Sequence, residues 1–251
     1  MADSVARPSV GPGWLRVVGL EAGFAWWSRY FLWALLVGVV VGIVSVPTLN
    51  GTAVAAEREF RQTVQQMREA GADVDAELRA PLHVETRGDQ VSTDNPLRYD
   101  YERARTALGM LRPSGYSANA LQLAGFLLAP LVAFGAGLTL ALKDFRHRTI
   151  RLRAVRFRLG SLELAYALTA GLIGVAAVIG AVVAAVCGGM VTSGPTISAL
   201  ALDVFEPIPD AVGTSVVAVW AGFAVVAAFY FAAIGVSIGL LTRALVAPMA
   251  T

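Results

Sequence analysis

Four long apolar runs, separated by polar segments, dominate the pattern of the chain. They cover residues 31–49, 120–142, 162–190 and 213–241. Each is near the ~20 apolar residues that a helix needs to cross a bilayer. A helix satisfies its own backbone hydrogen bonds in lipid, and the runs are too long and unbroken for the alternating strands of a membrane barrel. The pattern therefore predicts an all-α integral membrane protein with about four transmembrane helices.

The stretch before the first run predicts a further helix. Residues 14–30 are rich in aromatic side chains, with Arg16, Glu21 and Arg29 between them. This composition suits a helix that lies in the membrane interface. We therefore assign residues 1–30 to an amino-terminal segment with an interfacial helix, and a simple extension of the first span is the alternative. The first run is longer than the apolar part of a signal peptide, so we expect it to be retained.

Composition and charge agree with a membrane protein. Hydrophobic residues make up 56% of the chain and charged residues only 15%, which is too apolar for an ordinary soluble domain. The net charge of +2 hides an uneven distribution, because residues 143–158 carry seven Lys or Arg against one Asp, whereas residues 50–119 carry nine Arg against eleven acids. This balance reflects membrane topology and does not indicate a nucleic-acid partner.

The charges of the short segments predict the orientation, since short basic segments stay on the cytoplasmic side. The basic segment 143–161 follows the second run, and arginines also precede the first run and follow the fourth. The segment 191–212 has three acids and no Lys or Arg. We therefore expect a multi-pass protein of the cell membrane, in contact with membrane lipids. Both termini, including the tail 242–251, should be cytoplasmic, and residues 50–119 and 191–212 should be extracytoplasmic.

The extracytoplasmic segment 50–119 predicts a small, mostly helical domain between spans 1 and 2. Residues 53–80 contain no proline and have regularly spaced apolar residues, which favours a helix that continues out of the first span. A proline opens the polar, turn-rich stretch 81–95 and should end that helix. A second helix is expected over residues 99–111.

The chain has no catalytic or metal-binding pattern that fits this background. Lys143 is the sole lysine and follows Leu142 rather than a glycine, so there is no P-loop. The two histidines, His83 and His147, fall on opposite sides of the membrane in this topology, which excludes a paired-histidine metal site. The single cysteine, Cys187, excludes an intrachain disulfide. We therefore expect no enzyme activity and no cofactor in the chain itself.

Two G-x-x-x-G patterns predict close packing of helices. They place Gly38 and Gly42 in the first span, and Gly235 and Gly239 in the fourth. Small residues at this spacing let helix backbones approach each other. The second pattern also fits the G-x-S-x-G nucleophile motif around Ser237, but that chemistry needs a sharp turn from a strand into a helix. Inside an apolar helix, close packing is the preferred interpretation.

The second run and the basic segment resemble the permease subunits of type-2 ABC exporters. In that family a proline-containing helix leads into an acidic residue, a basic residue or glycine, a threonine and a basic stretch, as residues 125–154 do here. An interfacial helix, matched by 14–30, and a small-residue helix that ends at Arg243 extend the resemblance loosely over most of the chain. The family's cytoplasmic segment between spans 2 and 3 rests on a separate ATPase. The matching coupling residues would be Asp144, Arg146, Arg148, Thr149, Arg151 and Arg153.

This resemblance implies a membrane permease subunit that couples a cytoplasmic P-loop ATPase to export, with ATP and Mg²⁺ bound by that partner. The family usually has six spans, whereas this pattern predicts four. We therefore expect a second membrane subunit or a homodimer to complete the pathway, unless the chain is a shortened relative. The alternative function is a non-transporting scaffold or sensor whose outer helical domain binds a ligand or partner. Polysaccharide chain-length regulators are similar in layout, but they normally have two spans.

Overall fold

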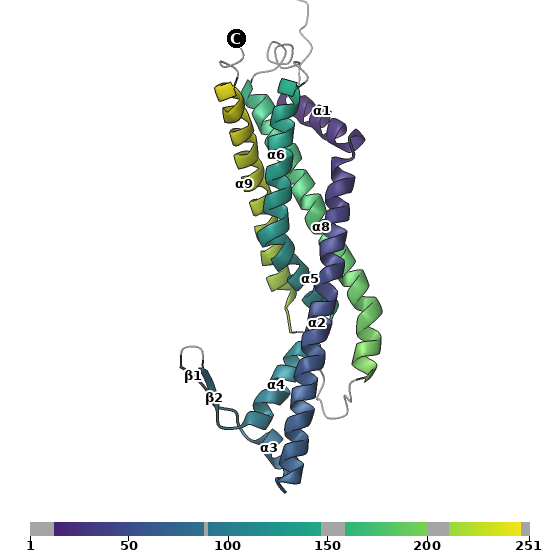
Figure 1. Cartoon of the computed structure of the whole chain (residues 1–251), viewed down its shortest axis with the longest axis vertical. Helices are drawn as coiled ribbons and strands as arrows, with labels where there is room; N and C mark the ends of the chain where they lie inside the picture. The colour runs from purple at the N-terminus through teal and green to yellow at the C-terminus, as the bar shows by residue number, and fades with distance from the viewer. Residues whose placement is uncertain (1–12, 88–89, 147–158, 200–210, 247–251) are drawn as a thin grey trace, which may run out of the picture. The chain divides into compact units, whose positions relative to one another are not determined.

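The computed structural model describes residues 13–87, 90–146, 159–199 and 211–246. Among these residues, four helices are long and apolar enough to cross a membrane. They are Tyr30–Glu69, Pro113–Lys143, Gly160–Thr192 and Thr214–Thr242. Apart from turns and one short hairpin, the described chain is helical (Figure 1). The prediction of an all-α membrane protein with about four spans is confirmed.

The helices carry the labels of Figure 1. The first long helix is α2 (Tyr30–Glu69). The second combines α5 (Pro113–Leu123), a π-helical turn η1 (Ala124–Leu128) and α6 (Ala129–Arg146). The third is α8 (Leu159–Ala199) and the fourth is α9 (Thr214–Val246).

The described residues fall into two compact units, and each long helix contributes to both. The first unit lies within 1–38, 123–180 and 221–251, and the second within 39–122 and 181–220.

A separate helix, α1 (Gly13–Trp27), precedes α2. The turn between them places Arg29 at a φ of 61°, a conformation that few non-glycine residues adopt. Trp26 and Trp27 are 72% and 87% exposed, as expected for aromatic residues at a membrane interface. The opposite face of α1 is buried and repeats every four residues. Its buried members are Val17, Glu21 and Ala25. The chain therefore has a separate helix here and not a simple extension of the first span, while its place in the membrane interface stays a prediction.

The first unit is held together by close approach of helix backbones. A Cβ added to Gly235 of α9 would lie 2.3 Å from the carbonyl oxygen of Phe134 in α6, and one added to Gly239 would lie 2.8 Å from Cβ of Ala141. On α8, a Cβ on Gly174 would lie 2.9 Å from a side-chain carbon of α6. Alanine is the commonest buried residue of these helices. Small side chains therefore let α6, α8 and α9 pack at short distance.

The second unit combines a small-residue contact with a polar network. The ring of Tyr116 in α5 occupies the space beside Gly189 of α8, where an added Cβ would lie 2.3 Å from it. The Tyr116 hydroxyl donates to Oδ1 of Asn50 at 2.6 Å, and Nδ2 of Asn50 donates to Oγ1 of Thr192 at 2.9 Å. These bonds connect α2, α5 and α8. Tyr116 belongs to a buried cluster whose apolar members also include Val46, Ala53, Leu108, Leu111, Ala120 and Ala185.

The helix that leaves the first span ends earlier than the expected residue 80. It stops at Glu69, where Gly71 adopts a φ of 76° and the Ala72 amide donates to the Met67 carbonyl at 3.0 Å. This is a common way for a glycine to end a helix. A short helix, α3 (Val74–Arg79), follows and is capped by Asp73, whose side chain accepts bonds from two backbone amides.

The turn-rich stretch after α3 contains a hairpin that the sequence did not lead us to expect. Strands β1 (Val84–Arg87) and β2 (Gln90–Thr93) are antiparallel, and Val84 lies opposite Thr93. Thr86 likewise lies opposite Val91. Both pairs are β-branched, which favours strand pairing. Two pairs within four-residue strands are too short a pattern to stand out in the sequence.

Helix α4 (Pro96–Gly109) corresponds to the helix expected over 99–111. It packs along α2, with the rings of Phe60 and Tyr101 5.8 Å apart in an edge-to-face arrangement. Ion pairs and hydrogen bonds flank this contact, including Arg103 with Glu59 at 2.6 Å. The part of α2 beyond the apolar run therefore has a helical partner of its own (Figure 1).

Replacing Gly42 by alanine should destabilise the protein by about 1–3 kcal/mol. A Cβ at this position would lie 2.2 Å from the carbonyl oxygen of Ala181 in α8, so the backbone would have to move. In the control variant G51A, also in α2, the new methyl meets nothing within 4 Å, and the change should be neutral or stabilising by about 0.5–1 kcal/mol. Thermal unfolding in lipid nanodiscs measures both. Equal melting temperatures would contradict this close approach.

Candidate functional site

The predicted coupling segment begins at the last turn of α6. Asp144 and Arg146 belong to that helix. The other predicted coupling residues lie outside the described residues, and they are Arg148, Thr149, Arg151 and Arg153. Lys143 is the last residue of α6 whose side chain is described. The coupling role of the segment therefore stays a prediction. The structure describes the helix α6, which precedes the rest of the segment.

A buried ion pair joins α1 to this end of α6. Nζ of Lys143 donates to Oε2 of Glu21, and the two side chains are only 9% and 2% exposed. Two charges withdrawn from water are tolerated when each compensates the other at close range. Removal of one partner would leave an uncompensated buried charge, which is strongly unfavourable. The pair therefore fixes α1 against the end of the second span.

Two aromatic rings complete the surroundings of the lysine. Nζ of Lys143 lies 3.6 Å from the ring centroid of Phe24 in α1 and 6.0 Å from that of Tyr166 in α8. A cation within about 6 Å of a ring face is attracted by it. Tyr166 is itself buried. The lysine thus contacts two side chains of α1 and lies near an aromatic ring of α8.

Sequence reasoning missed this pair. The sequence pattern alone presents Glu21 as one charge of an interfacial helix, and Lys143 as the first residue of a basic run. Two signals could have found it. Lys143 is the sole lysine in a chain whose other strongly basic residues are all arginine. Glu21 also falls on the four-residue repeat of small and apolar residues in α1, between Val17 and Ala25. A charge on an apolar stripe calls for a buried partner.

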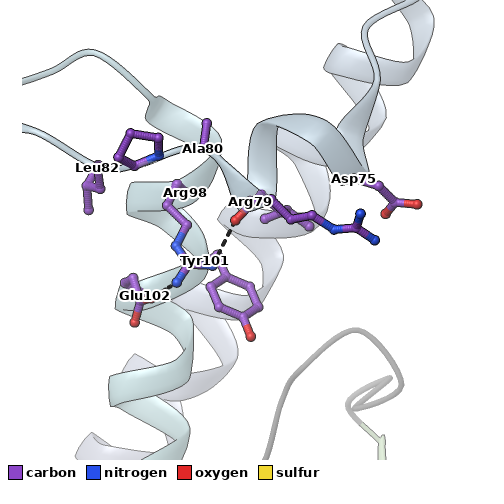
Figure 2. Close-up of a pocket in the computed structure, with 9 residues that line it drawn as sticks. Asp75, Arg79, Ala80, Leu82, Arg98, Tyr101 and Glu102 are labelled. Carbon is purple, nitrogen blue, oxygen red and sulfur yellow. Dashed lines mark hydrogen bonds and ion pairs between the residues drawn. The ribbon is translucent and has the colours of Figure 1, made fainter.

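A second candidate site is a cavity of about 680 Å³ in the second unit. Figure 2 shows that α3, the connection after it and α4 all contribute to its lining. Its residues are Asp75, Leu78, Arg79, Ala80, Pro81, Leu82, Arg98, Tyr101 and Glu102. The volume lies within the usual range for small-molecule sites.

One wall of this cavity is held by Arg98. Its Nη1 donates to the Leu78 carbonyl at 2.8 Å, and its Nη2 lies 2.6 Å from Oε1 of Glu102. The guanidinium carbon also lies 4.9 Å from the ring centroid of Tyr101. These contacts connect α3 to α4 and neutralise the arginine within the wall. The cavity therefore keeps its form through bonds made by the protein itself.

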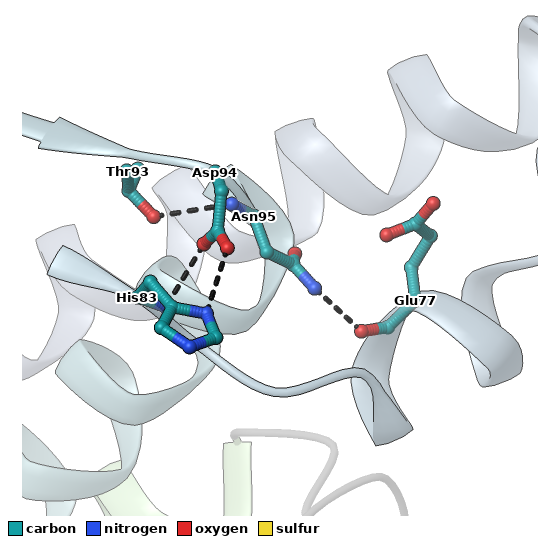
Figure 3. Close-up of polar contacts among 5 residues, drawn as sticks. All are labelled: Glu77, His83, Thr93, Asp94 and Asn95. Carbon is teal, nitrogen blue, oxygen red and sulfur yellow. Dashed lines mark hydrogen bonds and ion pairs between the residues drawn. The ribbon is translucent and has the colours of Figure 1, made fainter.

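The base of the hairpin is held by polar contacts between His83 and Asp94 (Figure 3). The His83 amide donates to Oδ1 of Asp94 at 2.9 Å, and Nδ1 of His83 lies 3.0 Å from Oδ2. The backbone bond from His83 is the main cause that holds the pKa of Asp94 below its usual value. Asn95 follows, and its Nδ2 donates to the Glu77 carbonyl of α3 at 2.8 Å. The same side chain caps α4 by accepting a bond from the Arg98 amide at 2.9 Å.

The other residues singled out in the sequence lie in regular helix. Gly38 is buried in α2, while Gly42, Gly235 and Gly239 lie at the close backbone contacts described above. Ser237 donates to the Ala233 carbonyl at 2.9 Å within α9, so no strand-to-helix elbow exists there. In the part of the chain that is described, no group of three or more His, Cys, Asp or Glu side chains could hold a metal ion.

Substituting Lys143 by methionine should destabilise the protein by about 3–5 kcal/mol, because Glu21 would keep a buried charge without its partner. The double variant E21Q/K143M removes both charges and should recover most of that loss. Unfolding of K143M, E21Q and the double variant in nanodiscs completes a double-mutant cycle, which gives the coupling free energy between the two side chains. The control R16Q changes an exposed charge of α1 and should have little effect. Additive single effects would contradict a direct pair.

Acid should loosen the base of the hairpin. The folded pKa of Asp94 lies below the ordinary 3.8, so its stabilising contribution is complete above that value and is lost as the pH falls through the lowered pKa. The NMR amide shift of His83 in the nanodisc-bound protein should therefore titrate below pH 3.8. A synthetic peptide of residues 80–97 should titrate at the ordinary value, and D94N should abolish the transition. Identical midpoints for protein and peptide would contradict the bond.

The two sites differ in chemistry. The buried ion pair can fix one helix to another, whereas the cavity combines charged and apolar groups that a ligand could contact.

No protein-family model matches this sequence, and no curated protein or solved structure matches it.

Proposed function

We propose that this chain is the membrane permease subunit of an ATP-driven exporter of the ABC type. In this proposal it couples a separate cytoplasmic P-loop ATPase to the movement of a substrate across the cell membrane. The resemblance of residues 125–154 to such permeases motivates the proposal. The buried pair of Glu21 and Lys143 is the structural observation that supports it.

The pair matters because a coupling element must not move independently of the spans. Lys143 directly precedes Asp144 and the basic stretch on which an ATPase would dock. Since Lys143 is bonded to α1 and lies near Tyr166 of α8, a displacement of the basic segment would act on these helices together. Rigid-body movement of packed helices is a common way to transmit such a change.

The proposal also assigns the parts outside this chain. The ATPase would bind ATP and Mg²⁺, and this chain would make no covalent bond itself. A second membrane subunit or a second copy of the chain would complete the substrate pathway. Both termini and the basic segment would face the cytoplasm, where anionic lipids also favour the arginines.

A second candidate is a membrane sensor or scaffold, and the cavity of the second unit favours it. The cavity is about 680 Å³ in volume, and its walls are fixed by hydrogen bonds and ion pairs. A ligand bound there would act on α3 and α4. This function needs no ATPase and makes no use of the basic segment beyond its contact with lipid.

Neutralising the basic segment separates the two candidates. The variant R146Q/R148Q/R151Q should insert into the membrane as the native chain does, but it should no longer retain an ATPase, because the cationic docking surface is lost. Affinity purification from native membranes in mild detergent, followed by mass spectrometry, measures the retained partner. The control R58Q/R68Q/R103Q removes three exposed arginines from α2 and α4 and should retain the ATPase.

Two results would contradict the exporter. One is a reproducible absence of any P-loop ATPase from the complex of the native chain. The other is full retention of the ATPase by the basic-segment variant. The sensor candidate predicts that this variant changes only membrane orientation or lipid binding.

A further inference from the structure

We propose that the cavity lined by α3 and α4 binds a short zwitterionic peptide with apolar side chains. The proposal goes beyond the exporter function, which does not require this cavity, and it gives the sensor candidate a ligand class. It is based on the charges that remain available in the cavity, on its apolar lining and on its size.

The available charges are one anion and one cation of α3. Asp75 and Arg79 both line the cavity, and both are exposed. Their spacing of one helical turn often pairs opposite charges. Even so, neither side chain takes part in an ion pair with any residue that the structure describes. Figure 2 shows both side chains extending to the same side of α3.

The remaining charges of the cavity compensate each other. Arg98 lies 2.6 Å from Glu102, and Glu102 also lies 3.8 Å from Arg105. The cavity therefore offers one ammonium-binding group and one carboxylate-binding group, with no excess of either sign. A ligand with a single charge would use only one of them. A peptide with free ends carries both an ammonium and a carboxylate.

The rest of the lining is suited to apolar side chains. Leu78, Pro81 and Leu82 contribute aliphatic surface, and Tyr101 contributes an aromatic ring. The ring of Tyr101 is supported from behind by Phe60 at a centroid distance of 5.8 Å. The volume of about 680 Å³ lies in the range of sites for drug-sized ligands. A peptide of about two or three residues suits this size better than a single amino acid does.

Binding would cost the protein little. Asp75 and Arg79 form no ion pair with any described residue, so a ligand would break none. Even a pair between these two exposed side chains would contribute almost nothing to stability. The position of α3 beside α4 is already fixed by the bonds of Arg98 to Leu78 and Glu102. A preformed wall reduces the ordering that a ligand must impose.

The test uses trileucine and two blocked forms of it. Isothermal titration calorimetry on the full chain in nanodiscs compares trileucine with N-acetyl-trileucine, which lacks the ammonium, and with trileucine amide, which lacks the carboxylate. Trileucine should bind more tightly than either. D75N should weaken the affinity for trileucine by about twofold to fivefold and leave the affinity for N-acetyl-trileucine unchanged. R79Q should also weaken the affinity for trileucine by about twofold to fivefold, and it should leave the affinity for trileucine amide unchanged. The control R68Q changes an exposed arginine outside the cavity and should have no effect.

Absence of saturable trileucine binding would overturn the proposal. Equal affinity for all three peptides would also overturn it. The same holds if D75N and R79Q each weaken the binding of all three peptides equally. Because the assay contains no ATPase and leaves the basic segment intact, its failure would not bear on the exporter. Loss of the ATPase partner would likewise leave the peptide result standing.

Discussion

Close approach of helix backbones is the constraint on which the rest of this structure depends. Helices surrounded by lipid gain little from burying apolar side chains against each other, so they associate through contact and a few polar bonds. Gly235 against Phe134, and Gly42 against Ala181, bring backbone atoms to distances that a larger residue would prevent. The alanines around these contacts serve the same purpose. The fold therefore depends on which side chains are small, more than on which are apolar.

Among the described residues of the spans, some polar side chains bond only within their own helix, as Ser237 does, whereas others join elements that are distant in the sequence. Glu21 and Lys143 connect α1 to α6 in the first unit. Tyr116, Asn50 and Thr192 connect α5, α2 and α8 in the second. Where such groups are shielded from water, a missing partner costs more than the bond itself contributes. These contacts therefore specify how the helices pair, while small residues decide how closely they approach.

The spans could be predicted because a bilayer imposes a length and a composition on each of them. The helix of α4 was also predictable, since prolines and polar turns delimit it. The pairing of Glu21 with Lys143 was harder to predict, because the two residues lie far apart along the chain and the signals that mark each of them do not link one to the other. The hairpin and the cavity were missed for a related reason. They depend on how residues 74–87 and 90–102 fold back on one another, and single residues such as Asn95 join several elements at once.

Because the chain has a single lysine, chemical labelling of that residue can report on the packing of α1 against α6. Its only side-chain amine is 9% exposed while α1 lies against α6. Acylating reagents attack the uncharged, accessible amine, so labelling of Lys143 requires the helices to separate and the ion pair to open. The rate of that labelling would follow the docking of α1 without any introduced probe. Conditions or partners that move the end of the second span could then be recognised from one modified residue.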